Sequence, residues 1–291
     1  MKARFTLIML IIAHISSADT LRVLSYNILN GYDYGKDTVR QANAIDFIKS
    51  QNADVVALQE LCGFTQEKLE KLAQKWGHAY AVIVKEEGYP VGITSNKPIE
   101  LKKKMREGLW HGMLHVKTHD IDFLVVHLSP FDFQFRRNEA KIITEYMANE
   151  IDDKGNFLVL GDFNALSSFD GFLNNSRPAL LERYRNGDAK SKYSNLMDGE
   201  YDYSVMSIFL SYPLIDLAAK YVLPRDRFSY PTPILIGSWR EVGEIIPSRC
   251  RIDYILSSRN LAQKCSNIEI INKGVVDSLS DHFPVLATFR L

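Results

Sequence analysis

The stretch from Phe157 to Asn164 places an acid and an amide directly after a run of apolar residues. Residues 157–160 predict a buried strand, and Gly161 lets the backbone turn and approach another group closely. If the extended geometry continues, Asp162 and Asn164 share one face and Phe163 points to the other. Such a carboxylate and carboxamide can hold a water or a hard metal ion and donate a hydrogen bond to a phosphoryl oxygen. The alternative is a strand followed by an Asx turn, because Asp and Asn both favour turns.

Three other polar residues end apolar runs in the first half of the chain: Asn27, Glu60 and His127. Burying Glu60 without a partner would be costly, so it lies at the mouth of a site or has a cationic partner. Each residue also has a structural alternative. Asn27 can cap the loop that Asn30-Gly31 indicates, Glu60 can form a salt bridge, and His127 can be a hydrogen-bonded structural histidine.

The C-terminal part repeats the pattern. Asp253 is embedded in an apolar strand over residues 249–256, where an unpaired charge would not be tolerated. Asp281 and His282 are adjacent and precede a final strand that reaches residue 289. Because the two residues directly precede a strand, we do not favour the alternative that they are adjacent at the surface by chance.

Arg136 and Arg137 stand at the start of a predicted helix over residues 136–151. There they could reach a phosphate group, because a guanidinium matches the geometry of phosphate oxygens. The alternative is a solvated surface charge, which we favour for at least one of the two.

These residues together indicate one kind of chemistry. The set contains carboxylates, amides and two histidines, but no Ser, Cys or Lys nucleophile. Carboxylates with amides suit Mg²⁺, with Mn²⁺ as the alternative, because both ions prefer oxygen ligands. Histidines and amides suit a phosphoryl group whose negative charge grows in the transition state.

Helices and strands must position these groups. Apolar residues at helical spacing predict amphipathic helices over residues 39–50 and 64–76, and residues 79–126 are typical of strands. Residues 166–247 are hard to interpret. Within them, Tyr230 to Trp239 combines prolines with an apolar tip; we favour a packed loop there, over a substrate loop or one that touches a membrane.

Six short motifs resemble, in order, those of the endonuclease/exonuclease/phosphatase superfamily, which includes secreted DNases, apurinic endonucleases, inositol-phosphate phosphatases and bacterial sphingomyelinases. The motifs are Ser25-Tyr26-Asn27, Leu58-Gln59-Glu60, His127-Leu128, Gly161-Asp162-Phe163-Asn164, Arg251-Ile252-Asp253-Tyr254 and Ser280-Asp281-His282. The resemblance spans residues 25–282. It implies a DNase I-like α/β fold, a four-layer sandwich of two packed mixed β-sheets flanked by helices.

The resemblance also implies a role for each matched residue. Glu60 would be the principal metal ligand, helped by Asn27 and Asp281. The catalytic roles would fall to five residues. Asp162 would orient or deprotonate the attacking water, Asn164 would hold that water and the phosphate, His282 positioned by Asp253 would stabilise the phosphoryl oxygens, and His127 would protonate the leaving oxygen.

Composition limits where and how the protein works. The 291 residues are 46% hydrophobic and 24% charged, as in an ordinary globular protein. Residues 1–18 have the layout of a secretory signal peptide, with Lys2 and Arg4 before an apolar run too short to span a bilayer. We therefore expect a single catalytic domain over residues 19–291, without a stable membrane anchor.

The mature chain carries little net charge. Without Lys2 and Arg4 it holds 33 basic and 35 acidic residues, a net charge of −2, which is not typical of a protein that coats nucleic acid. The cysteines Cys62, Cys250 and Cys265 show no CxxC spacing, so neither zinc nor a full disulfide framework is indicated. Cys250 and Cys265 could pair, or all three could be thiols.

The sequence thus predicts a secreted or periplasmic, Mg²⁺-dependent hydrolase that cleaves a phosphodiester by in-line attack of water, in the manner of a nuclease. DNA, a lipid head group and a small phosphate ester remain open as substrates, the last two by analogy with sphingomyelinases and with sugar or inositol phosphatases. We expect a monomer. An exported binding protein without turnover is the alternative from another class.

Overall fold

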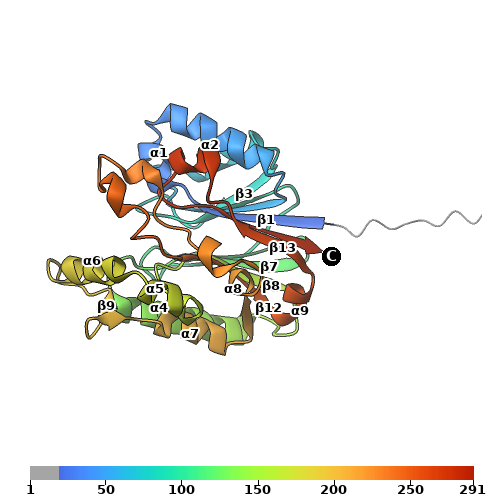
Figure 1. The fold of residues 1–291 in the computed structure, drawn as a ribbon. Coiled ribbons are helices and arrows are strands. Elements are labelled where there is room, and N and C mark those ends of the chain that lie inside the picture. Colours follow the sequence, from blue (N-terminus) through green and yellow to red (C-terminus); the bar gives the residue numbers. More distant parts are fainter. Residues whose placement is uncertain (1–19) are drawn as a thin grey trace, which may run out of the picture.

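The computed structural model describes residues 20–291. Two β-sheets pack face to face and helices cover the outer surface of each, so that four layers are visible in Figure 1. The predicted four-layer α/β sandwich is therefore confirmed. The predicted signal peptide over residues 1–18 lies outside the described residues.

Each sheet contains six strands. The first has the order β13 (Cys265–Ile270), β14 (Val285–Arg290), β1 (Thr20–Asn27), β2 (Val55–Gln59), β4 (Gly92–Ser95) and β3 (Tyr80–Ile83). The second has the order β11 (Leu214–Asp216), β12 (Asp253–Ser258), β8 (Phe157–Asp162), β7 (Ile121–His127), β6 (Met113–Thr118) and β5 (Glu100–Met105). Both sheets are mixed, because β1 pairs with β2 and β7 with β8 in parallel whereas the other pairs are antiparallel.

The helices form the two outer layers and the connections. They are α1 (Leu29–Tyr34), α2 (Thr38–Ser50), α3 (Gln66–Gln74), α4 (Phe133–Glu150), α5 (Gly171–Asn175), α6 (Pro178–Asp188), α7 (Ser204–Ser211), α8 (Leu217–Tyr221) and α9 (Arg259–Gln263), together with a short hairpin of β9 (Leu196–Met197) and β10 (Glu200–Tyr201). Among the helices of residues 20–291, none combines the length and apolar character that crossing a membrane requires.

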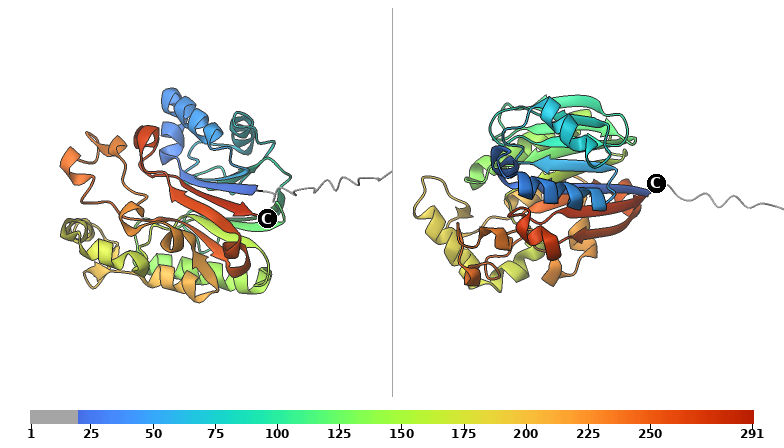
Figure 2. Two further views of the ribbon diagram at one scale, coloured as in Figure 1. Left: turned by 45° about the vertical axis from the view of Figure 1, so that its right-hand side comes forward. Right: turned by 90° about the horizontal axis from the view of Figure 1, so that it is seen from above.

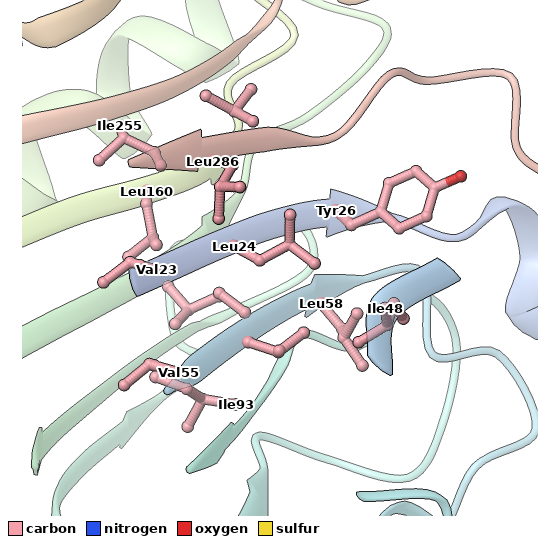
Figure 3. Packing of buried hydrophobic residues seen from close by; sticks show 14 of the residues in the cluster. Val23, Leu24, Tyr26, Ile48, Val55, Leu58, Ile93, Leu160, Ile255 and Leu286 are labelled. Carbon is pink, nitrogen blue, oxygen red and sulfur yellow. The ribbon is translucent and has the colours of Figure 1, made fainter. Parts of the chain in front are cut away.

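Strand β8 shows how alternating side chains fill two separate cores. Leu158 and Leu160 belong to the core between the sheets, whereas Phe157 and Val159 belong to the core beneath α4 and α7. This follows from the two-residue period of a strand. Figure 3 shows Leu160 among side chains of the first core that come from both sheets. A strand buried on both faces explains the continuous apolar run in the sequence.

The three predicted amphipathic helices are confirmed as α2, α3 and α4, within a few residues at each end. Each begins at a side chain that accepts a hydrogen bond from the third residue after it: Asp37, Thr65 and Asp132. The apolar stripes of α3 and α4 face the core, as the sequence pattern indicates, whereas in α2 Ile45 and Ile48 are buried but Val39 is 70% exposed.

The chain turns at Asn30-Gly31, as the sequence indicates, but in an unusual conformation. Residues 29–34, labelled α1, form a left-handed turn with φ between 51° and 59° at every residue. Such a backbone costs roughly 1–2 kcal/mol for each residue other than glycine, so other contacts must hold it. Arg40 supplies them by donating hydrogen bonds to the carbonyl oxygens of Ile28 and Leu29 at 2.9 and 3.0 Å.

The structure also shows the state of the cysteines and the elements of residues 166–247, which the sequence left open. Cys62, Cys250 and Cys265 are free and buried, so the alternative in which all three are thiols is the observed one. Residues 166–247 hold α5 to α8, the β9–β10 hairpin and β11.

Candidate active site

Three neighbouring strands bring functional side chains to one edge of the second sheet. In the strand register, Asp162 of β8 lies opposite His127 of β7 on one side and Asp253 of β12 on the other. Asp162 shares its strand face with Leu158 and Leu160, which point toward the first sheet. The three side chains therefore lie at the mouth of the space between the sheets.

The carboxylate of Asp162 is the centre of the site. Its Oδ2 accepts a hydrogen bond from Asn27 Nδ2 at 3.1 Å and lies 3.5 Å from His127 Nε2 and 3.8 Å from His282 Nε2. Its Oδ1 accepts the backbone N–H of Asn164 at 2.8 Å. Burial raises the pKa of Asp162 to about 8, although the charge of His282 opposes this shift.

The backbone around Asp162 requires particular residues. A Cβ atom on Gly161 would lie 2.0 Å from the carbonyl oxygen of Val126, so only glycine fits the close approach of β8 to β7. Of the two alternatives for this stretch, the strand followed by an Asx turn is the observed one. Strand β8 ends at Asp162, and Asn164 has a φ of 46° and closes an Asx turn onto Asp162. Both side chains nevertheless line one pocket, where Asn164 Nδ2 donates to the carbonyl oxygen of Leu128 at 3.1 Å.

His282 is held by an acid behind it, as the family resemblance implied for Asp253. The Nδ1 atom lies 2.8 Å from Asp253 Oδ2, and both side chains are buried. Burial by itself would lower the pKa of His282, but the carboxylates of Asp253, Asp162 and Asp281 hold it well above its usual value. The histidine is therefore charged, with Nε2 directed toward Asp162 and the pocket.

A buried ion network fixes the start of β12, two residues before Asp253. Arg251 is 1% exposed and pairs with both carboxylate oxygens of Asp216, at 2.7 and 2.8 Å. Its Nε also donates to Asp170 at 2.7 Å. Arg227 lies 3.2 Å from the other oxygen of Asp170. This network anchors the strand that carries Asp253, because a buried charge must keep its partners.

Glu60 follows β2 and faces Asp162 across the mouth of the sandwich. Its Oε1 accepts a hydrogen bond from Asn27 Nδ2 at 3.2 Å, and its Oε2 accepts the N–H of Asn30 at 2.7 Å. The left-handed turn thus serves the site by directing a backbone donor at this carboxylate. Burial, followed by the charge of Asp281, raises the pKa of Glu60.

The donor set fits a hard divalent cation. Glu60 and Asp281 both line the pocket, and burial raises the pKa of each. Two neighbouring carboxylates, Asp281 buried and Glu60 half-buried, repel one another and supply the oxygen ligands that Mg²⁺ or Mn²⁺ prefers. Asp162, Asp253 and His282 also place possible ligand atoms within 4.8 Å of one another. In that trio His282 Nδ1 is already engaged by Asp253, so its geometry is that of a catalytic hydrogen-bond relay.

Asn27 holds the two carboxylates of the site in place. Its Oδ1 accepts the backbone N–H of Leu29 at 3.1 Å, while its Nδ2 donates to Glu60 and Asp162. The oxygen keeps a second lone pair, so the expected role of Asn27 as a metal ligand stays a prediction.

His127 has an unexpected neighbour. The ring of His111 stacks on it with centroids 4.1 Å apart and an angle of 24° between the planes. Burial and then the charge of His111 lower the pKa of His127 well below its usual value, and burial lowers that of His111 to about 3.

Nearby, the buried carboxylate of Glu139 accepts the N–H groups of Trp110 and Ser129 at 2.8 Å each, and so connects α4 to two loops of the site.

The site opens into a cavity of about 500 Å³. It is lined by the predicted residues Glu60, His127, Asp162, Asn164, Asp281 and His282 and by residues that the sequence did not reveal, among them Tyr89, Trp110, His111, Phe131, Arg183, Tyr184, Tyr230, Trp239 and Arg240. The packed loop favoured for residues 230–239 is observed, since Pro231, Thr232 and Leu235 are buried. Tyr230 and Trp239 of the same loop also form part of the pocket wall, for which the prolines and the apolar tip were the available signal.

Comparison with known proteins now decides the family. The model of the endonuclease/exonuclease/phosphatase family matches residues 24–282. This chain belongs to that family. The members of the family are phosphoester hydrolases. The ordered motifs and the observed site of this chain agree with that membership. None of the curated proteins matches the chain in sequence.

Two solved structures resemble the family member described here. One is an AP endonuclease from Archaeoglobus fulgidus, at 17% identity and a TM-score of 0.68. The other is the 3′ phosphatase NExo from Neisseria bound to a product DNA hairpin, at 18% identity and a TM-score of 0.68. Each alignment covers 93% of this chain and 100% of the other. At these identities the likeness establishes the fold.

Arg136 and Arg137 do not join the site of this family member. Arg136 is buried and donates hydrogen bonds to the carbonyl oxygen of Ser129 and to Asn195 Oδ1, both at 2.9 Å. Arg137 pairs with Asp202 at 2.8 Å. Neither residue lines the pocket that holds Asp162 and His282, so structural roles replace their predicted role as phosphate ligands.

Proposed function

We propose that this protein is a secreted, Mg²⁺-dependent phosphodiesterase of the nuclease type. The observation that carries the proposal is the position of Asp162 Oδ2, which contacts Asn27 and faces both His127 and His282 at 3.5 and 3.8 Å. A carboxylate held in this way is suited to orient a water for in-line attack on a phosphoryl group.

The remaining residues divide the work of stabilising the transition state. The charged His282, held by Asp253, would donate from Nε2 to the phosphoryl oxygens, and Asn164 would hold the phosphate through its amide. Because burial lowers the pKa of His127, we infer a neutral imidazole. Its Nε2 faces Asp162, so that nitrogen would carry the hydrogen and donate a hydrogen bond to the leaving oxygen without transferring the proton. A Mg²⁺ ion held by Glu60 and Asp281 would neutralise charge on the phosphoryl group.

The pocket favours a second candidate substrate class. A cavity of about 500 Å³ with aromatic walls is the size of a small-molecule site. A small phosphate ester is therefore the alternative to a nucleic acid, whose case rests on the DNA-processing structures that share this fold. A lipid head group is a third possibility of the same chemistry.

We also propose that residues 1–18 are removed as a signal peptide and that the mature protein works outside the cytoplasm as a monomer without a membrane anchor. The charged and apolar layout of residues 1–18 supports export. Mass spectrometry of the protein recovered from the medium or periplasm of its host would test both the cleavage site and the location.

The function is tested with purified mature protein and Mg²⁺ on supercoiled plasmid and on bis(p-nitrophenyl) phosphate. The Asp162→Ala variant and an EDTA control run beside it. We expect hydrolysis that both controls abolish, while the thermal melting curve of the variant stays close to that of the native protein. Full activity of Asp162→Ala would refute the mechanism.

The two substrates separate the candidate classes. Nicking of the plasmid would support a nuclease, whereas turnover of the small diester alone would favour a small phosphate ester or a lipid head group. No turnover of any phosphate ester by folded, metal-loaded protein would favour an exported binding protein that keeps the fold.

A further inference from the structure

Two arginines line the pocket without taking part in the site described above. Arg183 projects from α6, and Arg240 lies in the segment after Trp239. Figure 1 and the left view of Figure 2 place α6 and the segment of residues 233–244, drawn in orange, at the same end of the sandwich. This end lies away from the one at which β1 begins. The sequence separation of these arginines from every family motif kept them out of the prediction.

Tyr230 connects Arg240 to the catalytic histidine. Its ring centroid lies 5.1 Å from that of His282, and its hydroxyl oxygen accepts a hydrogen bond from Arg240 Nη2 at 3.2 Å. The guanidinium of Arg240 is thus about one tyrosine side chain away from the group that would contact the scissile phosphate. The two positions are close enough for one substrate to reach both.

The positive charge of the pair is poorly balanced. Arg240 Nη1 and Nη2 donate to neutral acceptors, the carbonyl oxygen of Trp239 and the hydroxyl of Tyr230, and its buried Nε has no partner. Among residues 20–291, the only carboxylate within 4.0 Å of either guanidinium is that of Glu244, which lies 4.0 Å from Arg183 Nη1. Burial and then the charge of Arg240 lower the pKa of Arg183, as expected for like charges without an anion between them.

The other end of the pocket is acidic, so the expected metal position and the arginine pair differ in the sign of their charge. Glu60 and Asp281 supply negative charge where the metal would lie, so an anion without a metal is repelled there. At the arginine pair the free guanidinium donors match the geometry of phosphate oxygens. Trp239 is 62% exposed beside them and offers an aromatic face to the rest of a ligand.

We propose that Arg183 and Arg240 form a subsite for a second phosphate group of the substrate, one that is bound but not cleaved. The inference rests on the proposed function, because it assumes that the scissile phosphate lies at His282. The substrate class is then a phosphodiester that carries a further phosphate, either the neighbouring phosphate of a nucleic acid or that of a small bisphosphorylated molecule.

The first test needs no catalysis. Inorganic phosphate is titrated into the full mature protein in EDTA and followed by calorimetry and by ³¹P NMR line broadening. Arg183→Gln and Arg240→Gln should each weaken phosphate binding by about tenfold, since a hydrogen bond to a charged group contributes about 1.5–3 kcal/mol. Arg225→Gln is the control, because Arg225 is 80% exposed, lies outside the pocket and pairs with Asp226.

Binding of phosphate that the double variant Arg183→Gln/Arg240→Gln leaves unchanged would overturn the subsite, as would a native protein that binds no phosphate. Circular dichroism spectra and melting curves of the variants establish that they are folded. Both arginines are partly exposed, so their loss leaves no buried carboxylate without a partner.

The second test measures substrate preference. The p-nitrophenyl ester of thymidine 5′-phosphate is compared with the same ester bearing a 3′-phosphate, and a p-nitrophenyl glycerophosphate diester with its phosphorylated form. Native protein should prefer the member with two phosphates in at least one pair, by about tenfold in kcat/KM, and the variants should lose that preference. The pair that shows it identifies whether the phosphate belongs to a nucleotide or to a small molecule.

The two tests separate failure of the subsite from failure of the proposed function. Turnover of bis(p-nitrophenyl) phosphate with no preference in either pair would leave a phosphodiesterase and overturn the subsite. Arginine-dependent phosphate binding with no turnover of any ester would instead leave the subsite and overturn the function.

Discussion

Replacing Arg251 by methionine should destabilise the protein more than most single substitutions. Arg251 is 1% exposed and makes hydrogen bonds of 2.7–2.8 Å to two buried acids, Asp216 and Asp170. Methionine fills similar space but leaves these acids in an apolar setting. Arg227 still lies 3.2 Å from Asp170, so Asp216 carries most of the loss.

The expected loss in the free energy of unfolding is about 3–5 kcal/mol, the usual cost of removing one partner of a buried ion pair. For a domain of this size each kcal/mol corresponds to about 2–4 °C, so the melting temperature should fall by roughly 10 °C. Urea denaturation followed by circular dichroism measures the free energy, and a thermal scan measures the temperature.

Two controls sharpen the result. Arg225→Met removes an exposed arginine and should change stability by about 0.5 kcal/mol or less. Adding Asp216→Leu to Arg251→Met should recover part of the loss, because it removes the acid left without a partner. A loss below about 1 kcal/mol for Arg251→Met would refute the view that this network anchors β12.

Three further predictions concern the site. If Glu60 ligates the metal with Asp281, Glu60→Gln should raise the Mg²⁺ concentration needed for half-maximal rate, and an unchanged requirement in a metal titration would contradict that role. Asp253→Asn should lower kcat/KM by about 10²–10³-fold. Asp253 Oδ2 lies 2.8 Å from His282 Nδ1, and charge centres roughly 4–5 Å apart interact by about 3–4 kcal/mol at an effective dielectric near 20. Steady-state kinetics measures the loss, and activity within about threefold of native would exclude the relay. Burial raises the pKa of Glu139 to about 7 in spite of its two backbone donors, so the folded state binds more protons than the unfolded state between about pH 4.5 and 7. Its contribution to stability is then fully present below about pH 4.5 and is lost as the pH rises through 7; urea midpoints at pH 5 and 8 should differ less in Glu139→Gln than in the native protein, and an equal difference would argue against this shift.

Much of the site could be predicted because it depends on short stretches of chain. Asp162, Glu60 and His127 stand at the ends of apolar runs, where burial would be costly without a function or a partner. Helices α2, α3 and α4 follow from helical spacing alone, as do the buried stripes of α3 and α4. Motifs of two to four residues then sufficed to indicate the family and its fold.

Other features depend on which distant segments meet. The sequence around Asn27 does not say which end of its amide faces Glu60; the N–H of Leu29, placed by a left-handed turn that Arg40 holds, decides it. Nor does it say that Arg136 is buried against Asn195.

The pocket wall is the strongest example. Tyr230, Trp239 and Arg240 come from a segment with no regular period, and Arg183 from a helix more than forty residues earlier. Sequence patterns report the local conformation and burial of neighbouring residues, so the sequence by itself indicated the candidate catalytic side chains and the strands that carry them. The sandwich of two sheets came from the family resemblance. Only the tertiary structure decided what surrounds them, because the contacts of a loop depend on the elements it packs against.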